Sequence, residues 1–402
     1  MNTSYEPSER AVATILGDAT SGRRISAGDA HTLLLEGDLI ELGLAAHAVR
    51  DRHNDPEFAS YNIDRNINYT NVCVYKCRFC AFYREPGHAE GYLLPNEEIG
   101  RKVEETLALN GTGILMQGGV HPDLPLAYYE ELLSYLRENY PECHLHAFSP
   151  PEVKFIAAKE RMSFFDVIAR LKAAGLASVP GGGAEVLSDS IRRGVLAYPK
   201  CSADEWIDVM RQAHRNDLRT SATMMYGMGE KLEARVEHFQ RVRDLQDETG
   251  GFTAFISWTF QQEHTDLRTE RIPEVFAHEY LKTLAVSRLF IDNVDHFQTS
   301  WVTQGKKIGQ AALRFGADDM GSIMIEENVV ASAGTSYQMT QEEMEHLISE
   351  AGFRPRQRTN LYERFVTRQD TAALARRYRS SLTPEHRELL AHDRIARLPV
   401  VA

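Results

Sequence analysis

The sequence predicts an α/β protein: a TIM-like (βα) barrel, complete or partial, with helical extensions at both ends. Two observations carry this prediction. Short apolar or β-branched runs alternate with amphipathic stretches of helical spacing, an order typical of βα units and a parallel sheet. Reactive and turn-forming residues follow these runs directly, as expected where the carboxyl ends of barrel strands meet. A doubly wound sheet is the structural alternative.

The periodicity assigns the elements in order. Residues 26–53 carry apolar side chains at helical spacing and predict one or two helices that lead into the main domain. Strands are expected at 65–72, 113–117, 144–148, 176–179, 219–225 and 252–260, with weaker candidates at 294–299 and 320–325. Helices between them are expected at 96–109, 126–138, 163–174, 203–215, 231–247 and 274–290.

Three regions are expected along the chain: an N-terminal helical lead at 1–55, the barrel at 56–330 and a C-terminal helical extension at 331–402. Within the extension, the tail at 364–397 is rich in arginine and poor in turn signals. It is interpreted as a helical appendage with a locally positive face, either packed on the barrel or free for an interaction.

Length and composition exclude several classes of protein. The 402 residues include 43% hydrophobic and 25% charged residues, which is ordinary for a globular protein. The net charge of -12 argues against a general nucleic-acid binder, which presents a basic surface to phosphates. Residues 1–20 lack the basic start and apolar core of a signal peptide, and no run approaches the ~18 apolar residues of a membrane span. A cytoplasmic protein with no nucleic-acid or membrane partner is expected.

Three of the 5 cysteines lie in one short segment, Cys73-Val-Tyr-Lys-Cys77-Arg-Phe-Cys80. So few cysteines do not make a secreted disulfide framework. Structural zinc normally takes four protein ligands, and no second cysteine pair follows. Thiolates suit an iron–sulfur cluster, and three of them leave one iron of a 4Fe–4S cluster open to a substrate or cosubstrate. Zinc and plain structural thiols are the alternatives.

This spacing, with Phe79 before the last cysteine and a predicted strand before the loop, resembles the radical S-adenosylmethionine (SAM) superfamily. The resemblance implies a barrel of the radical SAM type and a 4Fe–4S cluster held by Cys73, Cys77 and Cys80. It also implies that SAM binds the open iron and is consumed as a cosubstrate, releasing a 5′-deoxyadenosyl radical that removes a hydrogen atom from the substrate. A flavodoxin or ferredoxin is implied as the electron donor.

Longer stretches resemble a subgroup with three activities: cyclisation of dehypoxanthinyl futalosine and synthesis of aminofutalosine, both in menaquinone biosynthesis, and the radical half of deazaflavin (FO) synthesis. Segments 66–73 and 78–83 are similar to the subgroup. Segment 144–152 is similar to the cyclases and the deazaflavin enzymes, and 180–185 to both futalosine enzymes. Segments 300–305, 315–322 and 325–330 are similar to the cyclases.

The resemblance therefore implies a radical SAM cyclase that forms an intramolecular carbon–carbon bond in dehypoxanthinyl futalosine, its small-molecule substrate. Hydrogen abstraction from the ribose and attack on the benzoate ring are implied, giving a spiro-fused product. Aminofutalosine synthase and the radical subunit of FO synthase are the alternatives. One residue departs from the family pattern, because Met228 stands where the family usually has His.

The resemblance also implies a set of SAM-binding residues. Gly118 and Gly119 follow the second predicted strand, where backbone approaches the methionine part of SAM; a plain strand-to-helix turn is the alternative. Backbone at Phe82 and Tyr83 is implied to meet the adenine, and core packing is the alternative for these rings. Glu185 is a candidate partner for a ribose hydroxyl or the SAM amino group, or else an ordinary carboxylate at a helix start.

Two histidines, His144 and His146, lie two residues apart and point to one face of a predicted strand. With His121 and Asp123 they are candidate ligands of a divalent metal, and the rival function is a TIM-barrel metal-dependent hydrolase. The alternatives are a histidine that positions substrate or moves a proton, and a packed structural histidine. The cyclisation needs a nearby base, for which His146 and Glu185 are the candidate catalytic residues.

Overall fold

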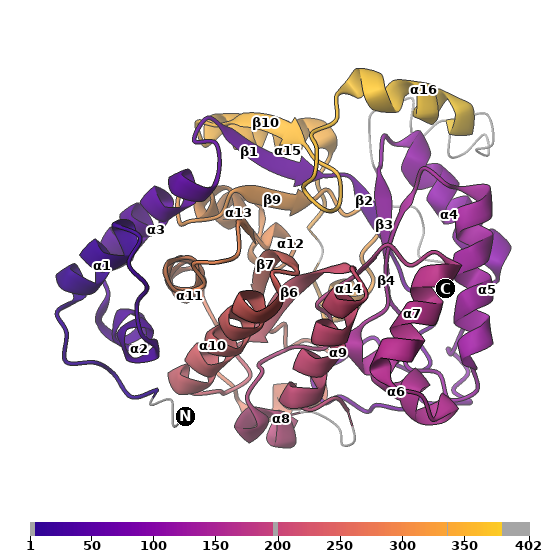
Figure 1. Cartoon of the computed structure of the whole chain (residues 1–402), viewed down its shortest axis with the longest axis horizontal. Helices are drawn as coiled ribbons and strands as arrows, with labels where there is room; N and C mark the ends of the chain where they lie inside the picture. Colours follow the sequence, from indigo (N-terminus) through magenta and orange to yellow (C-terminus); the bar gives the residue numbers. More distant parts are fainter. Residues whose placement is uncertain (1–4, 196–199, 336, 380–402) are drawn as a thin grey trace.

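The computed structural model describes residues 5–195, 200–335 and 337–379, and it shows a central parallel sheet with helices around it (Figure 1). The sheet has 10 strands in the order β10-β1-β9-β8-β7-β6-β5-β4-β3-β2. The strands are β1 (Phe58–Asn62), β2 (Asp64–Ile67), β3 (Gly113–Met116), β4 (His144–Ala147), β5 (Ser178–Val179), β6 (Arg219–Tyr226), β7 (Phe252–Thr259), β8 (His296–Gln298), β9 (Asp319–Ser322) and β10 (Arg354–Gln357).

The chain joins the two sides of this strand order, because only Ile63 separates β1, the neighbour of β10, from β2 at the other end. Strand β1 pairs with β9, where Ser60 is aligned with Asp319. Strand β2 pairs with β3, where Asp64 is aligned with Gly113. The sheet thus curls into the predicted barrel, and β10 pairs with the remaining edge of β1.

The helices mostly lie around the outside of this barrel (Figure 1). They are α1 (Val12–Thr20), α2 (Ala27–Glu36), α3 (Leu39–His53), α4 (Asn96–Ala108), α5 (Leu126–Asn139), α6 (Pro150–Glu160), α7 (Phe164–Ala174), α8 (Asp189–Val195), α9 (Ala203–Arg215), α10 (Leu232–Thr249), the 3-10 helix η1 (Asp266–Glu270), α11 (Ala277–Phe290), α12 (Trp301–Gln304), α13 (Lys306–Ala312), α14 (Val329–Ser332), α15 (Gln341–Glu350) and α16 (Arg368–Arg379). None of the helices in the described ranges is long and apolar enough to span a membrane.

Local signals explain where several helices begin. The side chain of Ser202 accepts a hydrogen bond from the backbone N–H of Glu205, and the Glu205 carboxylate accepts one from the backbone of Ser202, so that α9 starts with a capping box. Thr340 and Glu343 make the same arrangement at α15. These reciprocal bonds satisfy backbone donors that the first turn of a helix leaves without partners.

The eight predicted strands and six predicted barrel helices are all present, with ends shifted by a few residues. The strand predicted at 65–72 corresponds to β2, which ends at Ile67, and the preceding strand β1 was not predicted. Strand β10, with the sequence Arg-Pro-Arg-Gln, was not predicted, since it has no apolar alternation. It is a strand because its backbone adds to the free edge of β1.

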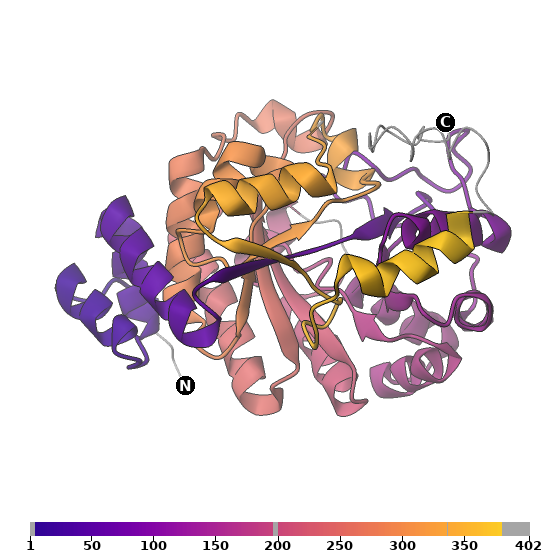
Figure 2. The same ribbon diagram turned by 90° about the horizontal axis from the view of Figure 1, so that it is seen from above.

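The C-terminal helix α16 lies along α4 (Figure 2). Tyr378 is buried there, with its ring 6.1 Å from the ring of Tyr140, and Arg377 pairs with Glu142 at 2.7 Å. Packing on the barrel is therefore what the structure shows for 368–379. The rest of the predicted arginine-rich tail, from 380 onward, lies outside the described residues.

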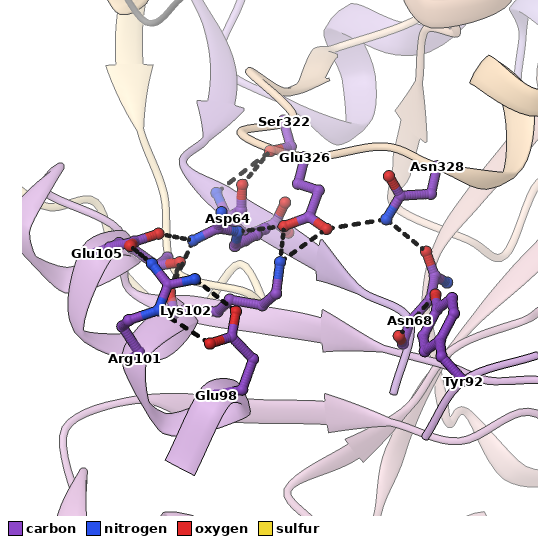
Figure 3. A network of polar contacts seen from close by, with 12 residues as sticks. Asp64, Asn68, Tyr92, Glu98, Arg101, Lys102, Glu105, Ser322, Glu326 and Asn328 are labelled. Atoms are coloured by element: carbon purple, nitrogen blue, oxygen red, sulfur yellow. Dashed lines mark hydrogen bonds and ion pairs between the residues drawn. The ribbon is translucent and has the colours of Figure 1, made fainter. Parts of the chain in front are cut away.

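A network of buried charges joins β2 to the segment that follows β9 (Figure 3). Arg65 on β2 lies with Nε 2.7 Å from Oε2 of Glu326, which follows β9, and with Nη1 2.5 Å from Oε2 of Glu105 on α4. Lys102 Nζ is 2.8 Å from the same Glu326 oxygen. Asn328 bridges from Glu326 toward the start of the cysteine loop, so the network ties this loop to the end of the barrel.

Candidate active site

A cavity of about 370 Å³ lies inside the barrel. Among the residues predicted for the site, Cys80, His146 and Glu185 line it. The segment after β2, the ends of β3 and β8, the loop 180–185 and the segment 358–362 form much of the wall. The cavity thus reaches from the cysteine loop to the turn after β10, and the tertiary structure brings together residues from most of the length of the chain.

The cysteine loop follows β2, and main-chain hydrogen bonds hold it. The backbone N–H of Cys73 donates to the carbonyl of Arg84 at 2.9 Å, and that of Cys80 donates to the carbonyl of Cys77 at 3.0 Å. The side chains of Cys73 and Cys77 are buried in a small hydrophobic cluster with Tyr75, against which Cys80 packs. All three thiols of the motif therefore belong to one local group of side chains.

Burial dominates the chemistry of these thiols. It raises the pKa of Cys73 and of Cys80, and it raises the pKa of Cys77 to about 12. Such thiols stay protonated at neutral pH until a metal takes the place of the proton. Soft sulfur donors in an apolar loop fit an iron–sulfur cluster, in which each thiolate binds a different iron. Across the described ranges, no group of three His, Cys, Asp or Glu side chains is disposed to hold a single metal ion.

Lys200 places a positive charge beside the cysteine loop, which the sequence did not indicate. Its Nζ lies 2.8 Å from Oε1 of Glu185 and 4.8 Å from the ring centroid of Phe79. Burial lowers the pKa of Lys200, but the nearby Cys77 and Glu185 outweigh burial and raise it to about 12. The ammonium therefore stays charged and is poised to offset the negative charge of thiolates.

The backbone around Glu185 has an unusual shape that two contacts maintain. Glu185 has a φ of 40°, in the left-handed region that favours glycine. Its carbonyl accepts a hydrogen bond of 3.0 Å from the backbone N–H of Met225, which ties the loop to β6. The buried guanidinium of Arg192 donates to the carbonyl of Gly183 at 3.2 Å and contacts the Glu185 carboxylate. These contacts hold the Glu185 side chain at the cavity wall.

The predicted glycines after β3 make close approaches to the cysteine loop instead of lining the cavity. A Cβ at Gly118 would lie 2.5 Å from the ring of Tyr69, and one at Gly119 would lie 2.3 Å from the carbonyl oxygen of Val72. The Gly118 N–H donates to the buried carboxylate of Glu152 at 3.2 Å. Absence of a side chain at both positions therefore lets the turn after β3 pack against the chain that carries Cys73.

The aromatic residues of the cysteine loop divide between the cavity and its surroundings. Phe79 lines the cavity with Cys80 and Ala81, and none of the cavity wall is formed by Phe82 or Tyr83. The latter two are partly buried, and Arg84 Nη1 donates to the carbonyl of Tyr83 at 3.0 Å. The sequence pattern marked Phe79 as part of the motif but did not indicate that its ring faces the cavity.

The two histidines of β4 share one partner on β5. His146 Nδ1 lies 2.6 Å from Oγ of Ser178, and His144 Nε2 lies 2.7 Å from the same oxygen. Burial lowers the pKa of His144 to about 4 and that of His146 to about 3. Both imidazoles are neutral at pH 7. His121, a candidate ligand of the rival hydrolase, instead accepts a hydrogen bond from the backbone of Asp123.

Met228, the departure from the family pattern, belongs to the core. Its side chain is buried, it does not line the cavity, and its N–H donates to Glu230 at 2.8 Å. The nearby Met225 does line the cavity.

The end of the cavity away from the cysteine loop is polar, and the sequence did not indicate it. Arg358, from the turn after β10, donates to both carboxylate oxygens of Asp319, at 2.5 and 2.9 Å. Its guanidinium lies 3.9 Å from the ring centroid of Tyr362, which stacks on His296. This segment is distant in sequence from the cysteine motif, and the pairing of β10 with β1 brings it to the barrel.

Comparison with known proteins agrees with this geometry. Residues 67–242 match the model of the radical SAM superfamily, and residues 249–371 match the CofH/MqnC C-terminal region. A cyclic dehypoxanthine futalosine synthase of Halalkalibacterium halodurans is 45% identical over 360 residues, which cover 89% of this chain and 96% of that protein. One of Streptomyces coelicolor is 43% identical over 89% of this chain and 90% of that protein.

The fold is also similar to that of a solved structure. The FeFe-hydrogenase maturase HydG of Carboxydothermus hydrogenoformans superposes with a TM-score of 0.71 over 95% of this chain and 87% of that one, at 15% identity. A 4Fe–4S cluster and SAM are the cofactors expected for the radical SAM superfamily, and the matched residues 67–242 include the cysteine loop that follows β2. The chain belongs to the radical SAM superfamily and, within it, to the family that contains the cyclic dehypoxanthine futalosine synthases.

Proposed function

We propose that this protein is a radical SAM cyclase that closes dehypoxanthinyl futalosine to its cyclic, spiro-fused form in menaquinone biosynthesis. The identity of 43–45% to cyclic dehypoxanthine futalosine synthases supports this activity. The structural observation that carries it is that Cys80 of the thiol motif lines the same cavity as His146 and Glu185. Radical chemistry and acid–base groups would then share one space.

In this proposal Cys73, Cys77 and Cys80 hold a 4Fe–4S cluster whose remaining iron is open to SAM. When bound, the pair supplies a 5′-deoxyadenosyl radical, and SAM is consumed. Lys200 neutralises charge at the thiolates. Gly118 and Gly119 place the turn after β3 against the cysteine loop, where the methionine part of SAM is proposed to lie.

Glu185 accepts a hydrogen bond from a SAM hydroxyl or amino group, and backbone at Phe82 and Tyr83 is proposed to meet the adenine. The barrel interior keeps water from the reacting atoms. The substrate loses a hydrogen atom from its fourth ribose carbon, and the ribosyl radical attacks the benzoate ring. Loss of one electron and one proton then restores the aromaticity of the benzoate ring. His146 is the first candidate for the base that accepts this proton, and Glu185 is the second.

The electron that first reduces the cluster is proposed to come from a flavodoxin or ferredoxin. A reducing cytoplasm suits this chemistry, because it keeps the three thiols free for iron.

The test is anaerobic reconstitution with iron and sulfide, followed by incubation with dithionite, SAM and dehypoxanthinyl futalosine. Chromatography with mass detection should find the cyclised product and 5′-deoxyadenosine in equal amounts. The Cys77→Ala variant should bind less iron and form neither product. Cys143→Ala, which removes a buried thiol outside the motif, is the matched control and should keep both. Cleavage of SAM with no cyclised product from wild-type protein would overturn the proposal.

A further inference from the structure

The barrel interior contains a chain of three polar side chains that leads away from the cavity. His146 on β4 and Ser178 on β5 are direct neighbours across the two strands. His144 lies two residues before His146 on the same face of β4. The Ser178 side chain is fully buried, and its Oγ lies 2.6 Å from one imidazole and 2.7 Å from the other.

The Ser178 hydroxyl group determines which atom donates the hydrogen in each of these two contacts. A serine hydroxyl has one hydrogen to donate and accepts through its lone pairs. If it donates to one imidazole, the other imidazole must donate to it. The two rings therefore hold the same tautomer, both protonated at Nδ1 or both at Nε2. A proton gained at Nε2 of His146, passed on through Ser178 and released at Nδ1 of His144 converts the first state into the second. This is the arrangement of a proton relay and not only of two packed histidines.

The two histidines at the ends of this row of side chains face different surroundings. His146 lines the cavity. Within the described ranges its Nε2 has no hydrogen-bond partner, and it is not among the polar atoms that are fully buried without one. His144 is partly exposed but does not line the cavity, and its backbone N–H bonds to Thr112 just before β3, at the amino end of the barrel strands. A proton accepted at His146 has a route to the opposite end of the barrel.

We propose that the proton released by cyclisation is accepted by His146 and then carried out of the cavity by Ser178 and His144. This proposal rests on the cyclase function proposed above. When the ring adduct of the substrate becomes aromatic again, the ring carbon that forms the new bond loses its hydrogen. The electron returns to the oxidised iron–sulfur cluster, and the proton goes to Nε2 of His146. The Nδ1 proton of His146 moves to Ser178, the Ser178 proton to Nε2 of His144, and the Nδ1 proton of His144 to solvent.

Burial supports this role, because it keeps both imidazoles neutral and ready to accept a proton at every pH near 7. A weak base is sufficient here, since the ring adduct that has lost an electron is a cation and becomes aromatic again when it loses its proton. Arg358, which lowers the pKa of His146 further, also opposes lasting charge on this ring. A proton that arrives must move on, and Ser178 is the group in contact with the far side of the ring.

The first test measures coupling between the two products. In Ser178→Ala and His144→Gln, 5′-deoxyadenosine should still form, but cyclised product per 5′-deoxyadenosine should fall about a hundredfold, at the lower end of what proton-transfer groups contribute. Ser178→Thr keeps the hydroxyl and should recover most of the coupling. Ser257→Ala is the matched control, because Ser257 is a fully buried serine on β7 away from the cavity wall.

The second test does not need the cluster. The ring nitrogens of ¹⁵N-histidine-labelled, unloaded protein report tautomers by their chemical shifts. Ser178→Ala should shift the resonances of both His144 and His146, whereas Ser257→Ala should shift neither. The relay is overturned if Ser178→Ala couples the two products as well as wild type does, or if only one imidazole responds. Wild-type protein that makes no cyclised product would instead overturn the cyclase function, so the two failures are distinct.

Discussion

Arg65 and Glu326 form a buried ion pair between the first and last parts of the barrel, with Nε 2.7 Å from Oε2. Their side chains are 1% and 12% exposed, so water contributes little to the solvation of either charge. Lys102 contacts the same carboxylate at 2.8 Å. Because the pair joins β2 to the segment after β9, it stabilises the closed barrel on which the cavity depends.

Loss of the Glu326 charge should destabilise the fold strongly. Glu326→Gln leaves Arg65 and Lys102 buried without their carboxylate, and removing one partner of a buried ion pair costs about 3–5 kcal/mol. Urea unfolding followed by circular dichroism should show that loss in the free energy of unfolding. Glu130→Gln, which breaks a surface pair with Arg170, is the control and should change it far less. Equal effects of the two substitutions would contradict the role of the buried network.

The same carboxylate should make stability depend on acid. Burial raises the pKa of Glu326, but Arg65 and Lys102 outweigh burial and lower it below the ordinary value. A lowered pKa in the folded state contributes stability above the unfolded value of about 4.3, and this stability is lost as pH falls through the folded pKa. The free energy of unfolding of wild type should fall below about pH 4.5, and Glu326→Gln should show a shallower fall. Parallel pH profiles of the two proteins would contradict this assignment.

The charge of Lys200 should ease ionisation of the motif thiols. Burial raises the pKa of Cys77, and Lys200 lowers it in part. Lys200→Gln should therefore raise this pKa further and slow alkylation of Cys77 severalfold in unloaded protein, as measured by mass spectrometry of the modified peptide at a fixed alkaline pH. Lys76→Gln removes an exposed lysine of the same loop and is the control. An unchanged alkylation rate in Lys200→Gln would show that the ammonium does not act on the thiols.

A side chain at Gly119 should displace the cysteine loop. The Cβ of alanine would lie 2.3 Å from the carbonyl oxygen of Val72, next to Cys73, and backbone on both sides must move to relieve the overlap. Gly119→Ala should therefore bind less iron per chain after reconstitution. In Gly17→Ala, the new Cβ on α1 meets open space, and the protein should keep its iron and gain about 1 kcal/mol from helix propensity. Normal iron content in Gly119→Ala would contradict the packing role of this glycine.

Local signals in the sequence determined much of the architecture. The helices α5 and α9 and the strands β3, β4 and β7 follow their predicted ranges closely, because each has a continuous apolar pattern and its own start and stop residues. The cysteine motif was also legible, since three thiols at short spacing lie in one loop whatever surrounds them. These features depend on neighbours along the chain, and a linear pattern records such neighbours.

The tertiary structure alone decided the rest. Strand β10 has no strand pattern of its own and exists because β1 offers it an edge. Lys200 beside the thiols, Ser178 between two histidines and Arg358 at the far end of the cavity are brought together from distant parts of the chain. Their partners and pKa values arise from burial and contact across the barrel, which no spacing in the sequence encodes.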